Sequence, residues 1–424
     1  MRRVLVTGIG VITALGGSAE QTWKGLLAGR SAIGPIRNFD ASSLRTRLAA
    51  EISGFDPLEF VDRRSARKMT RNEELAVSGA VLAVRDAGLN GEMDKERTAV
   101  FTGSSKEVSD LTKLVDAIVE STDDDGRFDV RRVGERTSRF HPLFYVEGLQ
   151  GASLFYISSA FNLRGANTYF AGTTESGMSA IGRAFRVVRR GEADCAIAGG
   201  FDDPVWWWSM SSFDSLGVLT SRNELGAAAF RPYDRDASGA VLGEGAAFVV
   251  LEEYEAARKR GARAYAEVGG YGCGADAYEL LTPHPDGRGL VHALRRVLQD
   301  ARCAPEEVSY VATHGSATPQ GDLSEARALR TVFGSAAQPP VASTVKPATG
   351  HLVGGAGALN VAVAALAVHE GAVPPTLNLE HPQPGCEFDW VPRSARELPV
   401  RRALAVARGL EGQNAVLALS SPGE

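Results

Sequence analysis

The sequence is poor in cysteine, and its four cysteines lie far apart, at Cys195, Cys273, Cys303 and Cys386. No C-x-x-C pair occurs, so the pattern is not that of a disulfide framework or a zinc site. We expect buried apolar thiols in a reducing compartment. Positive charge is also in deficit, since 46 lysines and arginines stand against 51 aspartates and glutamates. Because no basic surplus exists, the composition argues against a nucleic-acid-binding protein.

The amino terminus carries no targeting pattern. A strand begins almost at once, in Met1-Arg-Arg-Val-Leu-Val-Thr-Gly. We find neither a signal peptide nor an apolar run of membrane length, and we therefore expect a cytoplasmic protein. A chain of 424 residues is long enough for about three average domains, or for one large α/β unit in two parts.

The most informative absence is that of a cysteine in residues 169–186. The small polar residues 172–177 predict a turn that opens a helix, and a buried strand follows at 195–198. The positive backbone dipoles of a helix start lower the pKa of a thiol, which makes this a good position for a nucleophile. The residues present at the turn are instead Thr173, Thr174, Glu175 and Ser176.

Apolar strands and helices alternate along the whole chain. Strands separated by helices of this length predict a parallel or mixed sheet that is covered on both faces. The two parts of the chain have similar lengths and similar glycine-rich strand ends, which hints at internal duplication. We predict strands near 4–13, 98–103, 195–198, 245–253, 264–270, 308–313, 341–344 and 416–419, and helices near 18–29, 73–87, 288–302, 322–333 and 356–370.

Several segments allow two interpretations. Gly8-x-Gly10 is half of a dinucleotide-binding fingerprint, but the rest is missing, so we favour a plain tight turn. The basic run 63–71 is either a solvated face or a docking surface for an acidic partner. Residues 119–135 predict a surface excursion, and the aromatic residues of 141–157 fit a core helix or an apolar channel. The three tryptophans at 206–208 cannot all face one core, so at least one should meet solvent, a ligand or a partner chain.

Two histidines stand in glycine-rich loops. His314 follows a predicted strand, and His351 lies at the start of a helix of small residues, close after Lys346. Sites in α/β folds form at strand ends, so a functional role is as well supported as a structural one. Neither the histidines nor the acidic residues have a spacing that predicts a metal site.

Several long motifs occur in the order known from one enzyme family. They are Val6-Thr-Gly-Ile-Gly, the segment 176–200, Arg231-Pro-Tyr-Asp-Arg-Asp, Leu242-Gly-Glu-Gly, Leu251-Glu-Glu, Thr313-His-Gly-Ser, Gly321-Asp, Val345-Lys, Gly354-Gly-Ala-Gly and Val373-Pro-Pro-Thr-Leu-Asn. On these motifs the chain resembles the β-ketoacyl-acyl-carrier-protein synthase family from end to end. The resemblance implies an α/β thiolase-like fold, with two similar halves (1–252 and 253–424) in a layered α-β-α-β-α arrangement.

The resemblance also implies a chemistry, decarboxylative Claisen condensation without a cofactor. A cysteine takes an acyl chain from acyl carrier protein, and two histidines stabilise the enolate oxygen formed when malonyl-carrier protein loses carbon dioxide. The motif histidines correspond to His314 and His351, the family lysine to Lys346, and the cysteine position to Thr174. A threonine hydroxyl is a far poorer nucleophile than a thiolate, and Glu175 would oppose a developing negative charge.

A second departure lies near the carboxyl terminus. The family's gating loop reads Gly-Phe-Gly-Gly-Thr-Asn, whereas the corresponding run here is Gly-Leu-Glu-Gly-Gln-Asn, in which Asn414 is kept and Glu411 is new. Loss of both nucleophile and gate resembles the chain-length factor, the β subunit of type II polyketide ketosynthases. The implied partners are a ketosynthase α subunit and acyl carrier protein, with no nucleic acid and no membrane. Thr174 replaces the glutamine that such subunits commonly carry, and both histidines are present.

Two other functions stay open. The retained histidines allow a malonyl-acyl-carrier-protein decarboxylase, and Thr174 could itself act as a nucleophile. A partner subunit should have a large apolar interface and should shape an acyl tunnel. We expect the tunnel side chains within 104–114 and 143–156, with Phe144 and Phe155 as rings that either block the tunnel or pack in the core.

Overall fold

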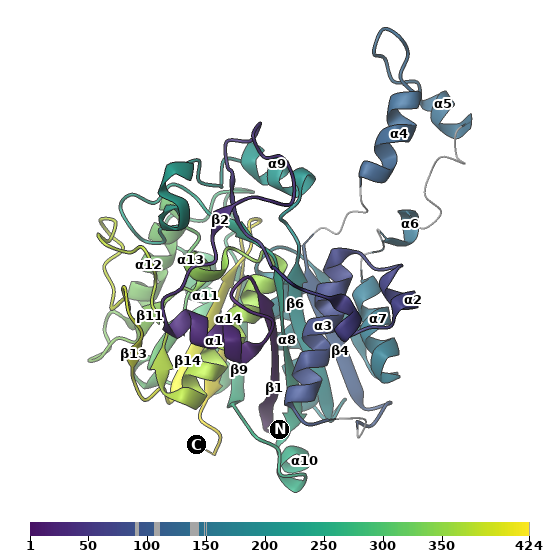
Figure 1. The fold of residues 1–424 in the computed structure, drawn as a ribbon. Coiled ribbons are helices and arrows are strands. Elements are labelled where there is room, and N and C mark those ends of the chain that lie inside the picture. The colour runs from purple at the N-terminus through teal and green to yellow at the C-terminus, as the bar shows by residue number, and fades with distance from the viewer. Residues whose placement is uncertain (90–92, 106–110, 136–143, 148, 150, 424) are drawn as a thin grey trace.

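The computed structural model describes residues 1–89, 93–105, 111–135, 144–147, 149 and 151–423 (Figure 1). Within these residues ten strands form one mixed sheet, in the order β11-β10-β14-β15-β9-β1-β8-β6-β4-β5. Their bounds are β1 (Val4–Thr13), β4 (Thr98–Ser104), β5 (Asn167–Ala171), β6 (Cys195–Asp202), β8 (Gly245–Glu253), β9 (Ala266–Ala275), β10 (Tyr310–Ala312), β11 (Val341–Ser343), β14 (Arg402–Arg408) and β15 (Gln413–Ser420).

The sheet repeats one pattern twice. In the first half β1, β8 and β6 pair antiparallel, and β6, β4 and β5 pair parallel. In the second half β9, β15 and β14 pair antiparallel, and β14, β10 and β11 pair parallel. The halves meet where β1 pairs with β9, Leu5 with Glu267 and Val6 with Ala266. The mixed sheet that we predicted is therefore present, and its strand order repeats; a domain boundary at residue 252 stays a prediction.

Helices form three layers around the two halves. The central layer is α8 (Glu175–Arg189) and α14 (Gly354–Glu370), which contact strands of both halves and supply much of the largest apolar core. On the outer faces, α3 (Arg71–Asp86) and α7 (Ala152–Phe161) cover the first half, and α11 (Arg288–Ala301) and α12 (Pro319–Phe333) cover the second. The result is the predicted α-β-α-β-α arrangement (Figure 1).

The central helix α14 corrects one expectation from the sequence. Residues Val353–Glu370 are long and apolar enough to cross a membrane, and no other helix in the described part of the chain passes that test. Our statement that no such run exists was therefore wrong. In the fold this helix is almost wholly buried between the two halves of the sheet, which is why it is apolar on every side.

Gly8 and Gly10 do not form the predicted turn, because both lie inside β1. A Cβ on Gly8 would stand 2.2 Å from the carbonyl oxygen of Ala83, and one on Gly10 would stand 2.1 Å from that of Gly79. Both carbonyls belong to α3. The two glycines therefore let a helix pack directly on the strand backbone, which is a packing role and not a turn or nucleotide-binding role.

Two of the helix starts that we predicted are fixed by side-chain caps. The hydroxyl of Ser18 accepts a hydrogen bond from the backbone of Gln21 at the start of α1 (Ala19–Leu27). Thr70 and Glu73 form a capping box at the start of α3. Strand β14 was not predicted. Its sequence, Arg-Ala-Leu-Ala-Val-Ala-Arg, is rich in alanine, which has low intrinsic strand preference, and burial between two neighbouring strands determines its conformation.

The other strands and α-helices are short and are not part of the ten-stranded sheet. They are β2 (Gly34–Pro35), β3 (Leu48–Ala50), β7 (Leu242–Gly243), β12 (Ala372–Val373), β13 (Arg396–Glu397), α2 (Arg63–Ala66), α4 (Thr112–Glu120), α5 (Val130–Glu135), α6 (Phe144–Glu147), α9 (Trp207–Ser215), α10 (Tyr254–Lys259) and α13 (Lys346–Thr349). Helices α4 and α5 stand away from the body, which confirms the predicted surface excursion (Figure 1).

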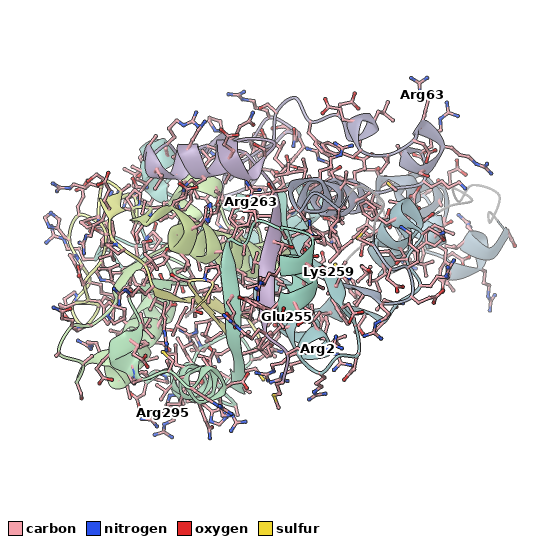
Figure 2. The ribbon with its side chains drawn as sticks, turned by 90° about the horizontal axis from the view of Figure 1, so that it is seen from below. Arg2, Arg63, Glu255, Lys259, Arg263 and Arg295 are labelled. Carbon is pink, nitrogen blue, oxygen red and sulfur yellow. The ribbon has the colours of Figure 1, made fainter. Side chains whose placement is uncertain are left out.

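Two other predictions about the protein surface can be compared with the structure. Trp208 is 43% exposed, so the expectation that at least one tryptophan of the run leaves the core is confirmed. Arg63, at the start of the basic run, stands at the outer edge of the molecule in Figure 2 and is exposed. This fits a solvated face, and a docking role for the run stays a prediction.

Candidate active site

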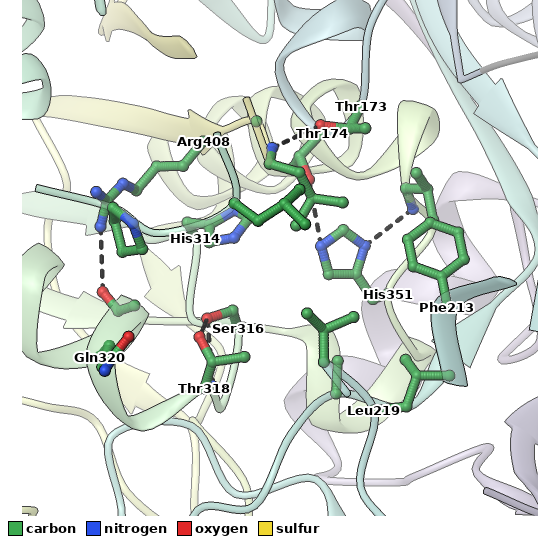
Figure 3. Close-up of a pocket in the computed structure, with 18 of the residues that line it drawn as sticks. Thr173, Thr174, Phe213, Leu219, His314, Ser316, Thr318, Gln320, His351 and Arg408 are labelled. Atoms are coloured by element: carbon green, nitrogen blue, oxygen red, sulfur yellow. Dashed lines mark hydrogen bonds between the residues drawn. The ribbon is translucent and has the colours of Figure 1, made fainter. Parts of the chain in front are cut away.

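Thr174 occupies the N-cap position of α8, directly before Glu175, as the sequence predicted for the central turn. Its side chain makes no cap hydrogen bond. The hydroxyl oxygen instead lies 3.2 Å from Nε2 of His351, and Figure 3 shows the two side chains facing each other. The turn after β5 thus presents a hydroxyl where the sequence led us to look for a nucleophile.

The second nitrogen of His351 determines the proton position of the ring. Nδ1 accepts a hydrogen bond of 2.9 Å from the backbone N–H of Val353. A neutral imidazole whose Nδ1 accepts must carry its proton on Nε2. The N–H of His351 therefore donates toward Thr174 and can serve a developing negative charge at that place.

His314 lies beside His351, with 5.6 Å between the ring centroids. Its loop is anchored through the main chain, since the N–H groups of His314 and Gly315 donate to the carboxylate of Glu325 at 2.8 and 2.9 Å. The ring Nδ1 is buried and makes no hydrogen bond within the described residues. Glu325 thus orients the loop, and the ring keeps its hydrogen-bonding capacity.

Burial dominates the electrostatics of this group. It lowers the pKa of both His314 and His351 well below the usual value, and the charge of Lys346 lowers both further. Both rings are therefore neutral at pH 7. Lys346 is itself buried, donates to the carbonyl oxygen of His314, and has a pKa that burial lowers to about 8. The predicted trio of two histidines and one lysine is brought together.

Thr174, His314 and His351 line a cavity of about 410 Å³, whereas Lys346 is buried and is not one of the lining residues. One part of its wall is apolar and is formed by Phe213, Val218, Leu219, Leu242, Leu281, Val353 and Leu410. The other part is polar and is formed by Asp276, Ser316, Thr318, Gln320 and Arg408, with a hydrogen bond of 2.7 Å between the hydroxyls of Ser316 and Thr318. Among the described residues no cysteine lines this cavity.

The turn 409–412 joins β14 to β15 and forms the cavity wall next to Thr174. Of the two residues that we named here from the sequence, Asn414 is buried below the turn, and its amide donates to the carbonyl oxygen of Gly412 at 3.0 Å. Glu411 is exposed and does not line the cavity. Sequence reasoning missed Arg408, although a charge at the end of an apolar run was a signal for it.

Glu175 is buried behind the cavity wall and is not one of the lining residues. Its carboxylate accepts hydrogen bonds of 3.3 Å from both the N–H and the hydroxyl of Thr173. Burial raises the pKa of this carboxyl. A Cβ on Gly172 or Gly409 would fall 2.2 or 2.3 Å from the carboxylate oxygens, so the group is held tightly between two turns.

The predicted tunnel residues lie apart from this cavity. Phe155, on α7, is 67% exposed, and Phe144, on α6, is half-buried; neither lines the cavity. Residues 106–110, Leu143, Gly148 and Gln150, which belong to the predicted tunnel stretches, lie outside the described residues. A tunnel role for these side chains stays a prediction. The described ranges also contain no group of three or more possible metal ligands.

Comparison with known proteins agrees with this geometry. The profile "Beta-ketoacyl synthase, N-terminal domain" matches residues 1–257, and "Beta-ketoacyl synthase, C-terminal domain" matches residues 265–380. The chain belongs to the β-ketoacyl synthase family. It is 37% identical over 421 residues to 3-oxoacyl-[acyl-carrier-protein] synthase 2 of Coxiella burnetii, and the match covers 99% of this chain and 98% of that protein.

Solved structures of this family have the same fold. A chain of "The ishigamide ketosynthase/chain length factor" superposes with a TM-score of 0.88 and 32% identity, and the match covers 100% of both chains. A chain of "AntDE:AntF (apo): type II PKS acyl-carrier protein in complex with its ketosynthase bound to the hexaketide" superposes with a TM-score of 0.87 and 25% identity, and the match covers 99% of each chain. The predicted thiolase-like fold is confirmed.

Proposed function

We propose that this chain is the chain-length-factor-like subunit of a ketosynthase heterodimer that elongates polyketide or fatty acyl chains bound to a carrier protein. The observation that carries the proposal is the hydroxyl of Thr174 at 3.2 Å from His351, in the place of a thiol. The site keeps two neutral histidines and a buried lysine, but it lacks the group that would accept an acyl chain. In such a heterodimer the condensation takes place in the partner.

The surface around β5 supports a partner. β5 is the outermost strand of the sheet, so one of its edges is not paired within the described residues. Next to it α7 exposes Phe155, and the preceding α6 exposes Tyr145 and Val146. Free strand edges and clusters of exposed apolar side chains mark protein–protein contacts. A second ketosynthase chain that pairs along β5 would cover both features and give the large interface expected of an obligate dimer.

The solved structures support the kinds of partner. One neighbour is named as a ketosynthase/chain length factor, and another as a ketosynthase in complex with a type II polyketide carrier protein. We infer that a ketosynthase α subunit and an acyl carrier protein are the partners of this chain. The length of the product is then set where the partner's acyl chain runs past residues of this subunit, for which Phe144 and Phe155 are our candidates.

The test is reconstitution with and without a partner. The purified chain should form no condensation product from acyl- and malonyl-carrier protein, whereas co-expression with a cysteine-bearing ketosynthase should yield a heterodimer that does. Mass spectrometry of the carrier protein detects the elongated chain. An active homodimer made of this chain alone would refute the proposal.

A second candidate function is malonyl-carrier-protein decarboxylation by this chain itself. The observation that favours it is the N–H on Nε2 of His351, which faces the hydroxyl of Thr174 in the cavity wall and is suited to stabilise an enolate oxygen there. Release of carbon dioxide from malonyl-carrier protein by the isolated chain would support it, with the rate lost in His351→Ala and His314→Ala. Absence of release in the unaltered chain would exclude it.

A further inference from the structure

Arg408 is a buried arginine in the cavity wall, and nearly all of its hydrogen-bond donors are engaged. Nε donates to the amide oxygen of Asn414 at 3.0 Å, and Nη1 donates to the carbonyl oxygen of Gly321 at 3.1 Å. Nη2 donates to the hydroxyl of Ser324 at 3.1 Å and to the carboxylate of Asp276 at 3.4 Å. One side chain thus connects the end of β14, the start of β15, helix α12 and the segment after β9.

Asp276 ties the same turn from the other side. Its backbone N–H donates to the carbonyl oxygen of Gly412 at 2.8 Å. Its carboxylate accepts a hydrogen bond of 3.0 Å from the side-chain amide of Asn414 and one of 3.1 Å from the backbone N–H of His284. Asp276 and Arg408 are both buried, so separation of the pair would leave two uncompensated charges in the protein interior. The carboxyl end of the turn 409–412 is therefore fixed.

The amino end of the turn is fixed to the stretch that carries Thr174. The backbone N–H of Leu410 donates to the hydroxyl of Thr173 at 3.0 Å. That hydroxyl in turn donates to the carboxylate of Glu175 at 3.3 Å. A Cβ on Gly409 would stand 2.3 Å from an oxygen of the same carboxylate, so the turn and this side chain are in close contact. An outward movement of the turn would have to break this chain of contacts as well.

We propose that Arg408 is a positioning residue which, together with Asp276 and Thr173, locks the turn 409–412 against Thr174 and so limits the cavity of this chain to ligands that end at Thr174. The cavity has a wall of fixed size at that point, since Gly409 and Leu410 line it beside Thr174. A short acyl group can reach Thr174, and a long acyl chain cannot continue past it. The inference deepens the proposed function, because a subunit closed in this way leaves the growing chain to its partner.

The experiment introduces a nucleophile and measures how long an acyl group it accepts. Full-length protein carrying Thr174→Cys is incubated with acetyl- or dodecanoyl-pantetheine. The introduced thiolate attacks the thioester carbonyl, the acyl–sulfur bond to pantetheine breaks, and the pantetheine thiol leaves. Peptide mass spectrometry gives each rate and separates the introduced thiol from Cys273, which is exposed. We expect acetyl transfer, and dodecanoyl transfer at least about tenfold slower, the factor that corresponds to roughly one net hydrogen bond.

Opening the lock should favour the long acyl chain over the short one. Arg408→Met with Asp276→Leu, in the Thr174→Cys background, removes both buried charges together; we expect the ratio of dodecanoyl to acetyl transfer rates to rise about tenfold. Amide hydrogen exchange in 409–412 should accelerate in parallel. Arg401→Met is the matched control, since Arg401 is exposed and lies directly before the far end of the same strand. An equal ratio with and without the lock would overturn the inference.

The hydrogen bond between Leu410 and Thr173 gives an independent test if the double replacement fails to fold. Thr173→Val removes the acceptor of the Leu410 N–H, whereas Thr173→Ser keeps it. Only the valine variant should speed dodecanoyl transfer and hydrogen exchange at the turn; equal behaviour of the two variants would also contradict the lock. The proposed function is tested by a different experiment, which asks whether the unaltered chain forms a condensation product without a partner.

Discussion

The hydroxyl oxygen of Thr174 is held 3.2 Å from Nε2 of His351, whose Nδ1 accepts the N–H of Val353. The two contacts leave one arrangement for a neutral ring, with the proton on Nε2. A site of this kind is prepared to donate to an oxygen and carries no group that forms an acyl thioester. The first prediction concerns this proton.

We predict that nitrogen-15 NMR of the imidazole will find His351 as the Nε2–H tautomer, neutral at pH 7 and still neutral below pH 6.5. Burial and the charge of Lys346 lower the pKa of this ring, so protonation needs a more acidic solution than for a free histidine. An Nδ1–H signal for His351 would contradict the assignment.

The buried Lys346 should leave a signature in the pH dependence of stability. Its pKa is about 8 in the fold and 10.5 in the unfolded chain. Between these values the unfolded chain holds a proton that the folded state has released, so the free energy of unfolding rises with pH in this window. The rise amounts to roughly 3 kcal/mol, or about 1.4 kcal/mol for each pH unit of separation.

Denaturant titrations from pH 7.5 to 10.5 should therefore find a smaller rise for Lys346→Met than for the unaltered protein. Exposed Lys24, exchanged in Lys24→Met, is the control and should leave the slope unchanged. If the free energy of unfolding rises equally with pH in Lys346→Met and in the unaltered protein, folding does not lower the pKa of Lys346.

Much of the fold and part of the site followed from the sequence, for identifiable reasons. Strand and helix periods gave the order of elements, and sequence-local motifs carried His314, His351 and Lys346. The lock around Arg408 could not be predicted, because it joins β14, β15, α12 and the segment after β9, and β14 itself has an alanine-rich sequence without a strand pattern. The turn predicted at Gly8 and Gly10 was wrong. In a sequence, a glycine that allows a helix to pack on a strand cannot be distinguished from a glycine that forms a turn.

We predict that Gly10→Ala destabilises the protein by about 2 kcal/mol or more, because its methyl group would collide with the backbone of α3. Gly17→Ala is the matched control, since a Cβ there meets no atom within 4 Å. Thermal and denaturant unfolding of the two variants measure the difference. Equal stability of both would mean that α3 shifts away from β1 without cost.

A further prediction concerns the surface beside β5. If the proposed ketosynthase partner binds here, Phe155→Glu should weaken the association by at least about tenfold, since a charge would be buried in the interface. Leu58→Glu changes an apolar side chain that is also exposed but lies on another segment, and it should have no effect. Analytical ultracentrifugation of the co-purified pair provides the measurement, and equal affinity for both variants would move the interface elsewhere.

If the same surface shapes the acyl tunnel, milder changes should alter the product. In the reconstituted heterodimer, Phe144→Ala and Phe155→Ala are expected to lengthen the chain, because a smaller side chain leaves more room along the tunnel. Mass spectrometry of carrier-bound products gives the length. Unchanged products from a heterodimer of normal affinity would assign these rings to packing alone.

The pairing of β1 with β8 has a consequence for synthesis. Residues 4–13 leave the ribosome well before their partner strand, residues 245–253. At roughly 5–20 residues per second, an apolar strand waits on the order of 12–50 seconds for its neighbour. Helix α3, which packs directly on Gly8 and Gly10 of β1, is synthesised much earlier than β8. It can therefore cover one face of β1 before β8 is available. The nascent chain, with its unpaired first strand, is thus the form of this protein most open to aggregation.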